Sequence, residues 1–253
     1  MNAPARQRVT LMGCAIDNLT MEETLQTVEE FIRSGTPHQH VVVNVDKLVK
    51  ASHDPALRDI INDCALVNVD GMPVVWASRL LGKPLKERVA GVDLFEALMR
   101  RAAEQRWRVY LLGAREDVVS EVAATYRRKY PQLVVAGYRN GYWNGEAEEA
   151  QVVAQVRDAH PDLLFVAISS PKKEQFLGRY QAEMKVPFAM GVGGTFDVAI
   201  GRVKRAPRWM QKAGLEWFYR FLQEPRRMFR RYFIEDMAFV WLFIKEAATR
   251  GGR

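Results

Sequence analysis

Short apolar runs rich in β-branched residues alternate along the chain with longer segments in which apolar residues recur every three or four positions. The short runs predict strands at residues 41–43, 65–69, 109–112, 133–136, 163–168 and 187–190. The longer segments predict amphipathic helices, the clearest of them at residues 94–106, 116–129 and 147–160. Alternating strands and helices indicate a mostly parallel sheet with helices on both faces. We therefore expect a Rossmann-like α/β fold.

The hydrophobic pattern changes at residues 201–207, and two further helices are predicted at residues 208–223 and 225–247. Pro225 suits the first turn of the second helix, because a backbone N–H would be unpaired there anyway. The apolar part of that helix, residues 237–244, is much shorter than the roughly 20 residues that cross a bilayer. We therefore divide the chain into a Rossmann-like domain at residues 1–200 and a helical C-terminal appendage at residues 201–253.

Positive charge and aromatic side chains are concentrated in this appendage. The whole chain has a formal net charge of +7, and residues 201–253 alone hold 13 Lys and Arg against 5 Asp and Glu, with 11 of the 26 aromatic residues. This combination favours an anionic lipid surface or phosphate groups as the partner. Residues 1–8 hold no apolar run of the length that a signal peptide needs, and nowhere do about 18 consecutive apolar residues occur. We expect a cytoplasmic protein that associates peripherally with the inner face of the cell membrane.

Candidate ligand-binding residues follow the predicted strands, because parallel sheets bind ligands beyond the carboxyl ends of their strands. Asp70 lies between a strand and Gly71, where a carboxylate can act as a general base. Asp70 is equally well placed to cap the helix predicted to begin near Met72. Asn44 directly follows the preceding strand.

The strongest local signal is the glycine loop after the last predicted strand, Gly191-Val192-Gly193-Gly194-Thr195-Phe196-Asp197. Such a loop lets backbone N–H groups approach a diphosphate, although a tight structural turn would need the same glycines. Gly113 and Ala114 form a weaker turn of this kind. No GxGxxG motif follows any strand, which argues against a dinucleotide cofactor.

Two further segments combine cations with signals for a helix start. Arg88 is a candidate phosphate ligand ahead of a helix that Asp93 would cap. In Ser169-Ser170-Pro171-Lys172-Lys173-Glu174, hydroxyls and lysines suit an anionic group, while Ser170 and Glu174 also suit a helix cap and capping box. No Asp-x-Asp pair is evident, so we expect amides and cations rather than a metal ion to neutralise a bound diphosphate. The two cysteines, Cys14 and Cys64, lack the spacing of a zinc site or a disulfide framework.

Taken in order, these segments resemble the WecG/TagA/CpsF glycosyltransferases, which are glycosyltransferase family 26. The resemblance extends over residues 9–232. Its segments are Asn44-Val45-Asp46-Lys47, Val69-Asp70-Gly71-Met72-Pro73-Val74-Val75-Trp76, Arg88-Val89-Ala90-Gly91-Val92-Asp93-Leu94, Leu111-Leu112-Gly113-Ala114, Gly141-Tyr142, Pro171-Lys172-Lys173-Glu174, the glycine loop, Arg205-Ala206-Pro207-Arg208-Trp209-Met210 and Gly214-Leu215-Glu216-Trp217.

The resemblance implies inverting transfer of a hexose or N-acetylhexosamine, for example N-acetylmannosamine or glucose, from a UDP-sugar to a polyprenyl-diphosphate-linked sugar in bacterial surface polysaccharide assembly. It implies that Asp70 is the catalytic base, that no metal or other cofactor is needed, and that the appendage packs on the membrane and contributes arginines. Two positions depart from the family pattern. Many members have threonine at the position of Val42, and the motif that commonly reads Pro-Lys-Gln-Glu has Lys173 in place of glutamine.

The expected site combines these observations, with Asp70 as the catalytic residue. The expected donor-binding residues are Asn44, Gly71, Arg88, Gly113, Ala114, Pro171, Lys172, Glu174, Gly191, Gly193, Gly194, Thr195 and Asp197. The residues expected at the acceptor or the membrane are Arg205, Arg208, Arg220, Arg226, Arg227, Arg230 and Arg231.

The expected partners are a UDP-sugar, a polyprenyl-diphosphate-linked acceptor and an anionic membrane surface, and no nucleic acid. Two other functions stay open on the residues alone. One is a nucleotide-dependent oxidoreductase on a similar sheet, and the other is a nucleic-acid-binding module that uses the basic appendage. Whether the chain forms a homo-oligomer is also open.

Overall fold

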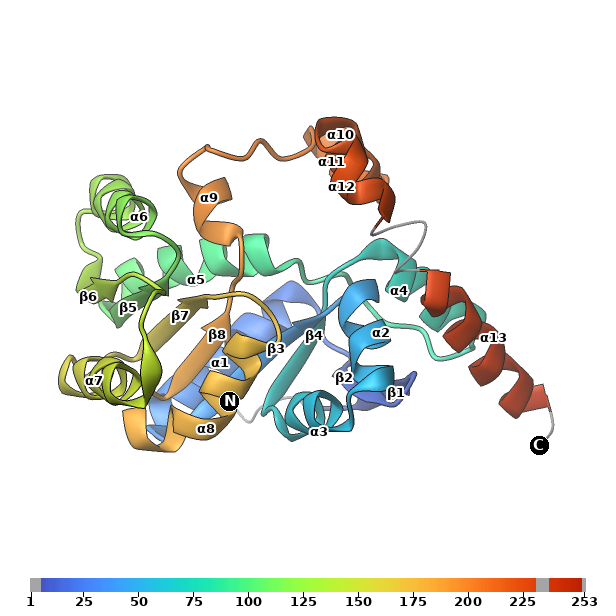
Figure 1. Cartoon of the computed structure of the whole chain (residues 1–253), viewed down its shortest axis with the longest axis horizontal. Helices are drawn as coiled ribbons and strands as arrows, with labels where there is room; N and C mark the ends of the chain where they lie inside the picture. Colours follow the sequence, from blue (N-terminus) through green and yellow to red (C-terminus); the bar gives the residue numbers. More distant parts are fainter. Residues whose placement is uncertain (1–5, 231–236, 252–253) are drawn as a thin grey trace.

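A computed structural model of the chain describes residues 6–230 and 237–251, and its centre is a six-stranded sheet (Figure 1). The strands of this sheet are β3 (His38–Val43), β4 (Leu66–Val69), β5 (Arg108–Gly113), β6 (Val134–Arg139), β7 (Leu163–Ala167) and β8 (Phe188–Gly191). Their order is β4-β3-β8-β7-β5-β6, and every neighbouring pair is parallel. The predicted α/β fold is therefore confirmed. A separate antiparallel hairpin, β1 (Arg8–Leu11) and β2 (Cys14–Asp17), was not predicted.

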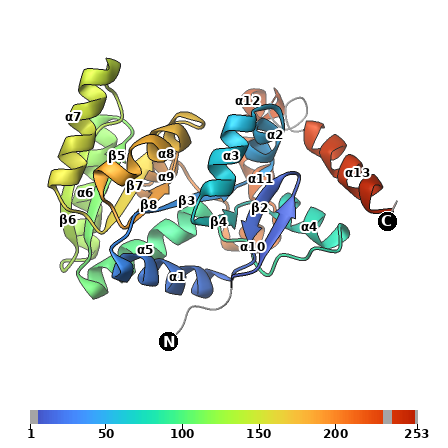
Figure 2. The same cartoon turned by 90° about the horizontal axis from the view of Figure 1, so that it is seen from below.

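Helices cover both faces of the sheet (Figure 2). One face carries α1 (Met21–Ser34), α5 (Gly91–Gln105), α6 (Glu116–Lys129) and α9 (Thr195–Ala199). The other face carries α2 (Val45–His53), α3 (Pro55–Asp63), α7 (Gly145–Asp158) and α8 (Lys172–Met184), while α4 (Met72–Leu80) follows β4. Along β5, Leu111 packs on the first face and Leu112 on the second. Because alternate residues are buried on opposite faces, the central strands are continuously apolar in sequence.

A buried polar network ties β3 and β4 to α1. The ring Nε2 of His40 lies 2.9 Å from Asn68 Oδ1, and Asn68 Nδ2 donates to Thr24 Oγ1 at 3.0 Å. Burial lowers the pKa of His40 to about 4, so the ring is neutral at pH 7. This network holds the two strands whose carboxyl ends carry Asn44 and Asp70.

The C-terminal segment contains four helices within the described residues, and one prediction about them was wrong. They are α10 (Arg208–Lys212), α11 (Glu216–Gln223), α12 (Pro225–Arg230) and α13 (Met237–Gly251). The helix predicted at residues 208–223 is interrupted at Gly214, whose φ of 74° ends α10 in a left-handed turn. Within the helix predicted at residues 225–247, the structure describes α12 and α13, and residues 231–236 lie outside the description. Over the described part of the chain, no helix has the length and apolar character needed to span a membrane.

These C-terminal helices pack against the rest of the chain at several points. A Cβ at Gly214 would lie 2.7 Å from Met72 Cγ and 3.0 Å from a ring carbon of Trp76, so glycine permits this close approach to α4. Further along, Phe239 and Phe243 of α13 pack on the core beneath α2. The domain boundary at residue 200 stays a prediction.

Candidate functional site

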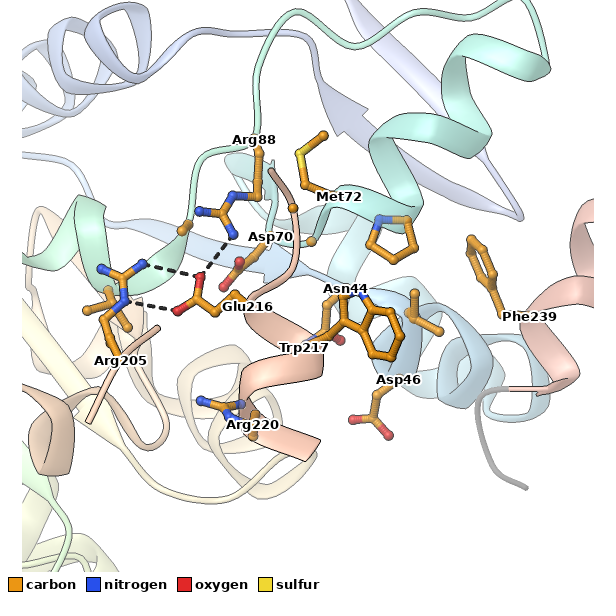
Figure 3. A pocket seen from close by; sticks show the side chains of 16 residues that line it. Asn44, Asp46, Asp70, Met72, Arg88, Arg205, Glu216, Trp217, Arg220 and Phe239 are labelled. Carbon is orange, nitrogen blue, oxygen red and sulfur yellow. Dashed lines mark hydrogen bonds and ion pairs between the residues drawn. The ribbon is translucent and has the colours of Figure 1, made fainter. Parts of the chain in front are cut away.

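A pocket with a volume of about 340 Å³ lies at the carboxyl ends of β3 and β4 (Figure 3). Asn44, Asp70 and Arg88 contribute to its wall from the sheet side. On the other side its wall contains Arg205, Glu216, Trp217 and Arg220 from the C-terminal segment and Phe239 from α13. The pocket is therefore built jointly by both parts of the chain, and its volume falls within the usual range of ligand sites.

Asp70 follows β4 directly and is half-buried at the base of this pocket. Its Oδ2 accepts a hydrogen bond from the Gly91 N–H, at the start of α5, at 3.2 Å. The alternative that Asp70 caps α4 was wrong, because Gly71 occupies that cap position and no side chain bonds there. Burial raises the pKa of Asp70 above its usual value, and this effect outweighs the Gly91 hydrogen bond and the charge of Arg88. A carboxylate with raised proton affinity that faces a cavity has the properties of a general base.

Two arginines and two carboxylates form an ion-pair network beside Asp70. Glu216 accepts from Arg88 Nη1 at 3.1 Å and from Arg205 Nε at 2.9 Å. Arg205 also donates two hydrogen bonds to Asp93, at 2.5 Å and 3.2 Å. Asp93 was expected to cap α5, but this helix begins two residues earlier at Gly91, which leaves the Asp93 side chain to bind Arg205 instead. Burial raises the pKa of Glu216, but Arg205 and Arg88 outweigh it and hold the pKa below its usual value.

A second charged cluster lies between α2 and α8. Glu174 Oε1 accepts from Lys47 Nζ at 2.7 Å and lies 3.6 Å from Lys173 Nζ, and all three residues are buried. Glu174 therefore binds a distant lysine and takes no part in a capping box. The expectation that Ser170 caps α8 was also wrong, because Pro171 is at the cap position without a side-chain hydrogen bond.

The two glycine turns differ in what their backbone groups bind. A Cβ at Gly113 would lie 2.5 Å from the Ala167 carbonyl oxygen, and the Ala114 N–H donates to that oxygen at 2.9 Å. Gly113 is therefore required by the close packing of β5 on β7, and the Ala114 N–H is already bonded. In the other turn, a Cβ at Gly191 would lie 2.9 Å from the Lys173 side chain. The absence of a side chain at Gly191 thus makes room for Lys173.

The structure brings together only some of the predicted residues. Those that line the pocket are Asn44, Asp70, Gly71, Arg88, Arg205 and Arg220. Those outside its wall are Gly113, Ala114, Pro171, Lys172, Glu174, Gly191, Gly193, Gly194, Thr195, Asp197, Arg208 and Arg226. Arg231 lies outside the described residues, as do the side chains of Arg227 and Arg230. Their roles stay predictions.

The expected site residues did not include three charged residues of these clusters: Glu216, Lys47 and Lys173. Glu216 and Lys47 were within segments of family resemblance, but nothing in the local pattern indicated their distant partners.

Val42 also lies near Asp70, the candidate catalytic residue. A Cβ at Gly91 would contact both Val42 Cγ2, at 3.6 Å, and Asp70 Oδ2, at 3.7 Å. Among the residues that the structure describes, no group of three or more His, Cys, Asp or Glu is arranged to hold a metal ion.

Comparison with known proteins adds an independent result. The model of the Glycosyl transferase WecG/TagA/CpsF family matches residues 9–253. The chain belongs to this family. It is therefore a glycosyltransferase, and the oxidoreductase and nucleic-acid-binding alternatives are set aside.

Two curated relatives support this assignment. One, from Bacillus subtilis (strain 168), is 36% identical over 196 residues, which cover 78% of this chain and 75% of the relative. The other, from Bacillus spizizenii, is 36% identical over 187 residues, which cover 74% of this chain and 72% of the relative. Each bears the name N-acetylglucosaminyldiphosphoundecaprenol N-acetyl-beta-D-mannosaminyltransferase.

Proposed function

We propose that this chain is an inverting, metal-independent glycosyltransferase that acts at a membrane surface. Its donor is a UDP-sugar that carries a hexose or N-acetylhexosamine, and its acceptor is a polyprenyl-diphosphate-linked sugar. The observation that carries the proposal is Asp70, a carboxylate with raised pKa at the base of a pocket walled by both parts of the chain. The names of the two relatives support a lipid-linked acceptor and an N-acetylhexosamine as the transferred sugar.

Asp70 has a defined part in this reaction. Its carboxylate takes the proton from the acceptor hydroxyl as that oxygen forms a bond to the anomeric carbon of the donor. The bond between the anomeric carbon and UDP breaks on the opposite face, so the configuration inverts. A raised pKa suits this step, because a general base is most effective when its pKa lies near the working pH.

Charged side chains near the pocket suit the two diphosphate groups. Arg220 lines the pocket and forms no ion pair with any described residue, so its guanidinium is available to the acceptor. Lys173 and the glycine loop lie at the neighbouring strand end and suit the donor diphosphate. The apolar part of the wall, Trp217 and Phe239, suits the first isoprene units of the lipid.

The test is release of UDP by the purified protein, supplied with a panel of UDP-sugars and an N-acetylglucosaminyl-diphosphate-polyprenol acceptor. We expect acceptor-dependent UDP release with at least one donor and an unchanged rate in EDTA. Asp70→Asn should lower the rate by roughly 10² to 10⁴-fold, which is the usual contribution of a general base. Asp63→Asn, at an exposed position on α3, is the matched control and should behave as the wild type.

The proposal is wrong if no donor supports UDP release, or if Asp70→Asn is as active as the wild type. Loss of activity in EDTA would contradict metal independence alone.

A further inference from the structure

Two arginines of the pocket wall, Arg88 and Arg205, are engaged by carboxylates other than Asp70. In Figure 3 the guanidinium groups of Arg88 and Arg205 converge on Glu216, at the side of Asp70. Arg205 is held from a second side by Asp93. The Asp70 carboxylate forms no ion pair with any described residue, and the one hydrogen bond it accepts from them comes from the Gly91 N–H.

These partners come from different parts of the chain. Arg88 precedes α5, whereas Glu216 is the first residue of α11, 128 positions later. Docking of α11 therefore brings in the carboxylate that engages Arg88. The approach depends on Gly214, because a side chain there would collide with Met72.

An arginine beside two carboxylates pairs with the one that offers the better geometry, and the other keeps a higher proton affinity. Pairing with Arg88 would stabilise the charged form of Asp70 and occupy its oxygens. Both effects would weaken a general base, because it must accept a proton from the acceptor hydroxyl.

We propose that Glu216 is a positioning residue: with α11 docked, it holds Arg88 away from Asp70 and leaves the Asp70 carboxylate free to receive the acceptor proton. The inference rests on the proposed function, in which Asp70 is the base. It makes the C-terminal segment a requirement for the chemical step as well as for binding the lipid.

Charged groups come from each element that surrounds the pocket and Asp70. Asp46 comes from α2, Arg88 from the loop before α5, Asp93 from α5, Arg205 from the segment before α10, and Glu216 and Arg220 from α11. After burial, which is the largest effect, Arg88 lowers the pKa of Asp70, while Glu216 and Asp93 raise it. These effects on the pKa of Asp70 have the signs expected for a nearby cation and two nearby carboxylates.

The test compares Glu216→Gln with Arg88→Gln through the pH dependence of kcat/KM for sugar transfer. Glu216→Gln removes the nearer carboxylate partner of Arg88 and leaves Asp93 Oδ2 at 4.0 Å from Arg88 Nη2, so Arg88 can turn toward Asp70. The acidic limb of the profile should then move to lower pH by about one unit, and kcat should fall. Arg88→Gln should move the same limb to higher pH. A purely structural role for Glu216 would lower the rate at every pH without moving the limb. Glu224→Gln, which replaces a carboxylate at the opposite end of α11 that does not line the pocket, is the control.

A second measurement does not depend on activity. The carboxyl carbon of Asp70, identified by its absence in Asp70→Asn, can be titrated by ¹³C NMR in the full chain without substrates. Its titration midpoint should fall in Glu216→Gln and rise in Arg88→Gln. If Glu216→Gln does not fold, Glu216→Asp keeps the negative charge on a shorter side chain. It should lower the titration midpoint of Asp70 by a smaller amount than is expected for Glu216→Gln.

Unchanged midpoints in the folded variants would overturn the role of Glu216. Shifted midpoints in a protein that transfers no sugar would support the positioning of Arg88 and overturn the proposed function instead.

Discussion

The cluster of Lys47, Lys173 and Glu174 places two buried lysines around one carboxylate. Glu174 pairs closely with Lys47, which leaves Lys173 at the longer distance of 3.6 Å. Burial lowers the pKa of Lys173, and the charge of Lys47 lowers it further. The Lys173 stem packs against Gly191, and its Nζ would lie 3.5 Å from a Cβ at Gly193. A buried cation with an incomplete partner beside a glycine loop suits an anionic ligand.

We predict that Lys173→Gln, which restores the commoner family residue, weakens donor binding. The KM for the UDP-sugar should rise about tenfold with little change in kcat, since a hydrogen bond to a charged group contributes about 1.5 kcal/mol. Steady-state kinetics with varied donor measure this. Lys185→Gln, at the exposed far end of α8, is the control. An unchanged KM, or a fall in melting temperature with equal loss of kcat, would indicate a structural role for Lys173.

At the scale of elements, Glu246 of α13 forms an ion pair and a hydrogen bond with the N-terminal part of the chain. One carboxylate oxygen pairs with Lys83 Nζ at 2.6 Å, and the other accepts from the Met12 N–H at 2.5 Å. Lys83 also donates to the Thr10 carbonyl oxygen at 2.8 Å. The helix that supplies Phe239 to the pocket is therefore also held at the β1–β2 hairpin.

We predict that Glu246→Ala loosens α13 without unfolding the sheet. It removes two hydrogen bonds to charged groups and leaves Lys83 unpaired with its carboxylate, a loss of about 2 kcal/mol in docking. Limited trypsin digestion should cleave within residues 226–245 several-fold faster than in the wild type, while residues 1–200 stay intact. Thr249→Ala, at an exposed position further along the same helix, keeps every trypsin site and should leave the cleavage rate at the wild-type level. If trypsin cleaved Glu246→Ala at the wild-type rate, apolar packing alone would hold α13 in place.

At the scale of the whole molecule, large apolar side chains are exposed at one end. Figure 1 places α10–α12, α4 and α13 together there. The most exposed include Trp209, Leu222, Trp241 and Leu80, the last being 77% exposed on α4. The exposed apolar surface therefore includes α4 as well as the C-terminal segment. Apolar patches next to arginines are typical of proteins that lie on anionic membranes.

We predict that the double variant Trp209→Ser, Trp241→Ser binds vesicles containing phosphatidylglycerol about tenfold more weakly or worse, because two aromatic side chains no longer enter the interface. Vesicle sedimentation measures this. Tyr142→Ser, which removes an exposed aromatic outside this end of the molecule, should bind normally. Raising the salt should weaken wild-type binding only in part, since salt screens the arginines and leaves the aromatic contribution. Wild-type affinity in the double variant would contradict a membrane role for this surface.

Fold class was predictable because a buried parallel strand reads as a continuous apolar run and its covering helices as an amphipathic repeat. The same rule located Asn44 and Asp70, since both directly follow predicted strands whose carboxyl ends meet at one edge. Helix caps were less predictable. Asp70, Asp93 and Ser170 all have capping residue types at helix starts, yet none caps its own helix.

The sequence by itself determined the sheet, the strand-end position of Asp70 and the segments that mark the family. Only the tertiary structure decided that Glu216 meets Arg88 and that Glu174 meets Lys47, partners 128 and 127 positions apart. The physical reason is the separation along the sequence between the residues in contact. Periodicity and capping express contacts within a few residues, whereas these ion pairs exist only because tertiary packing brings distant side chains together.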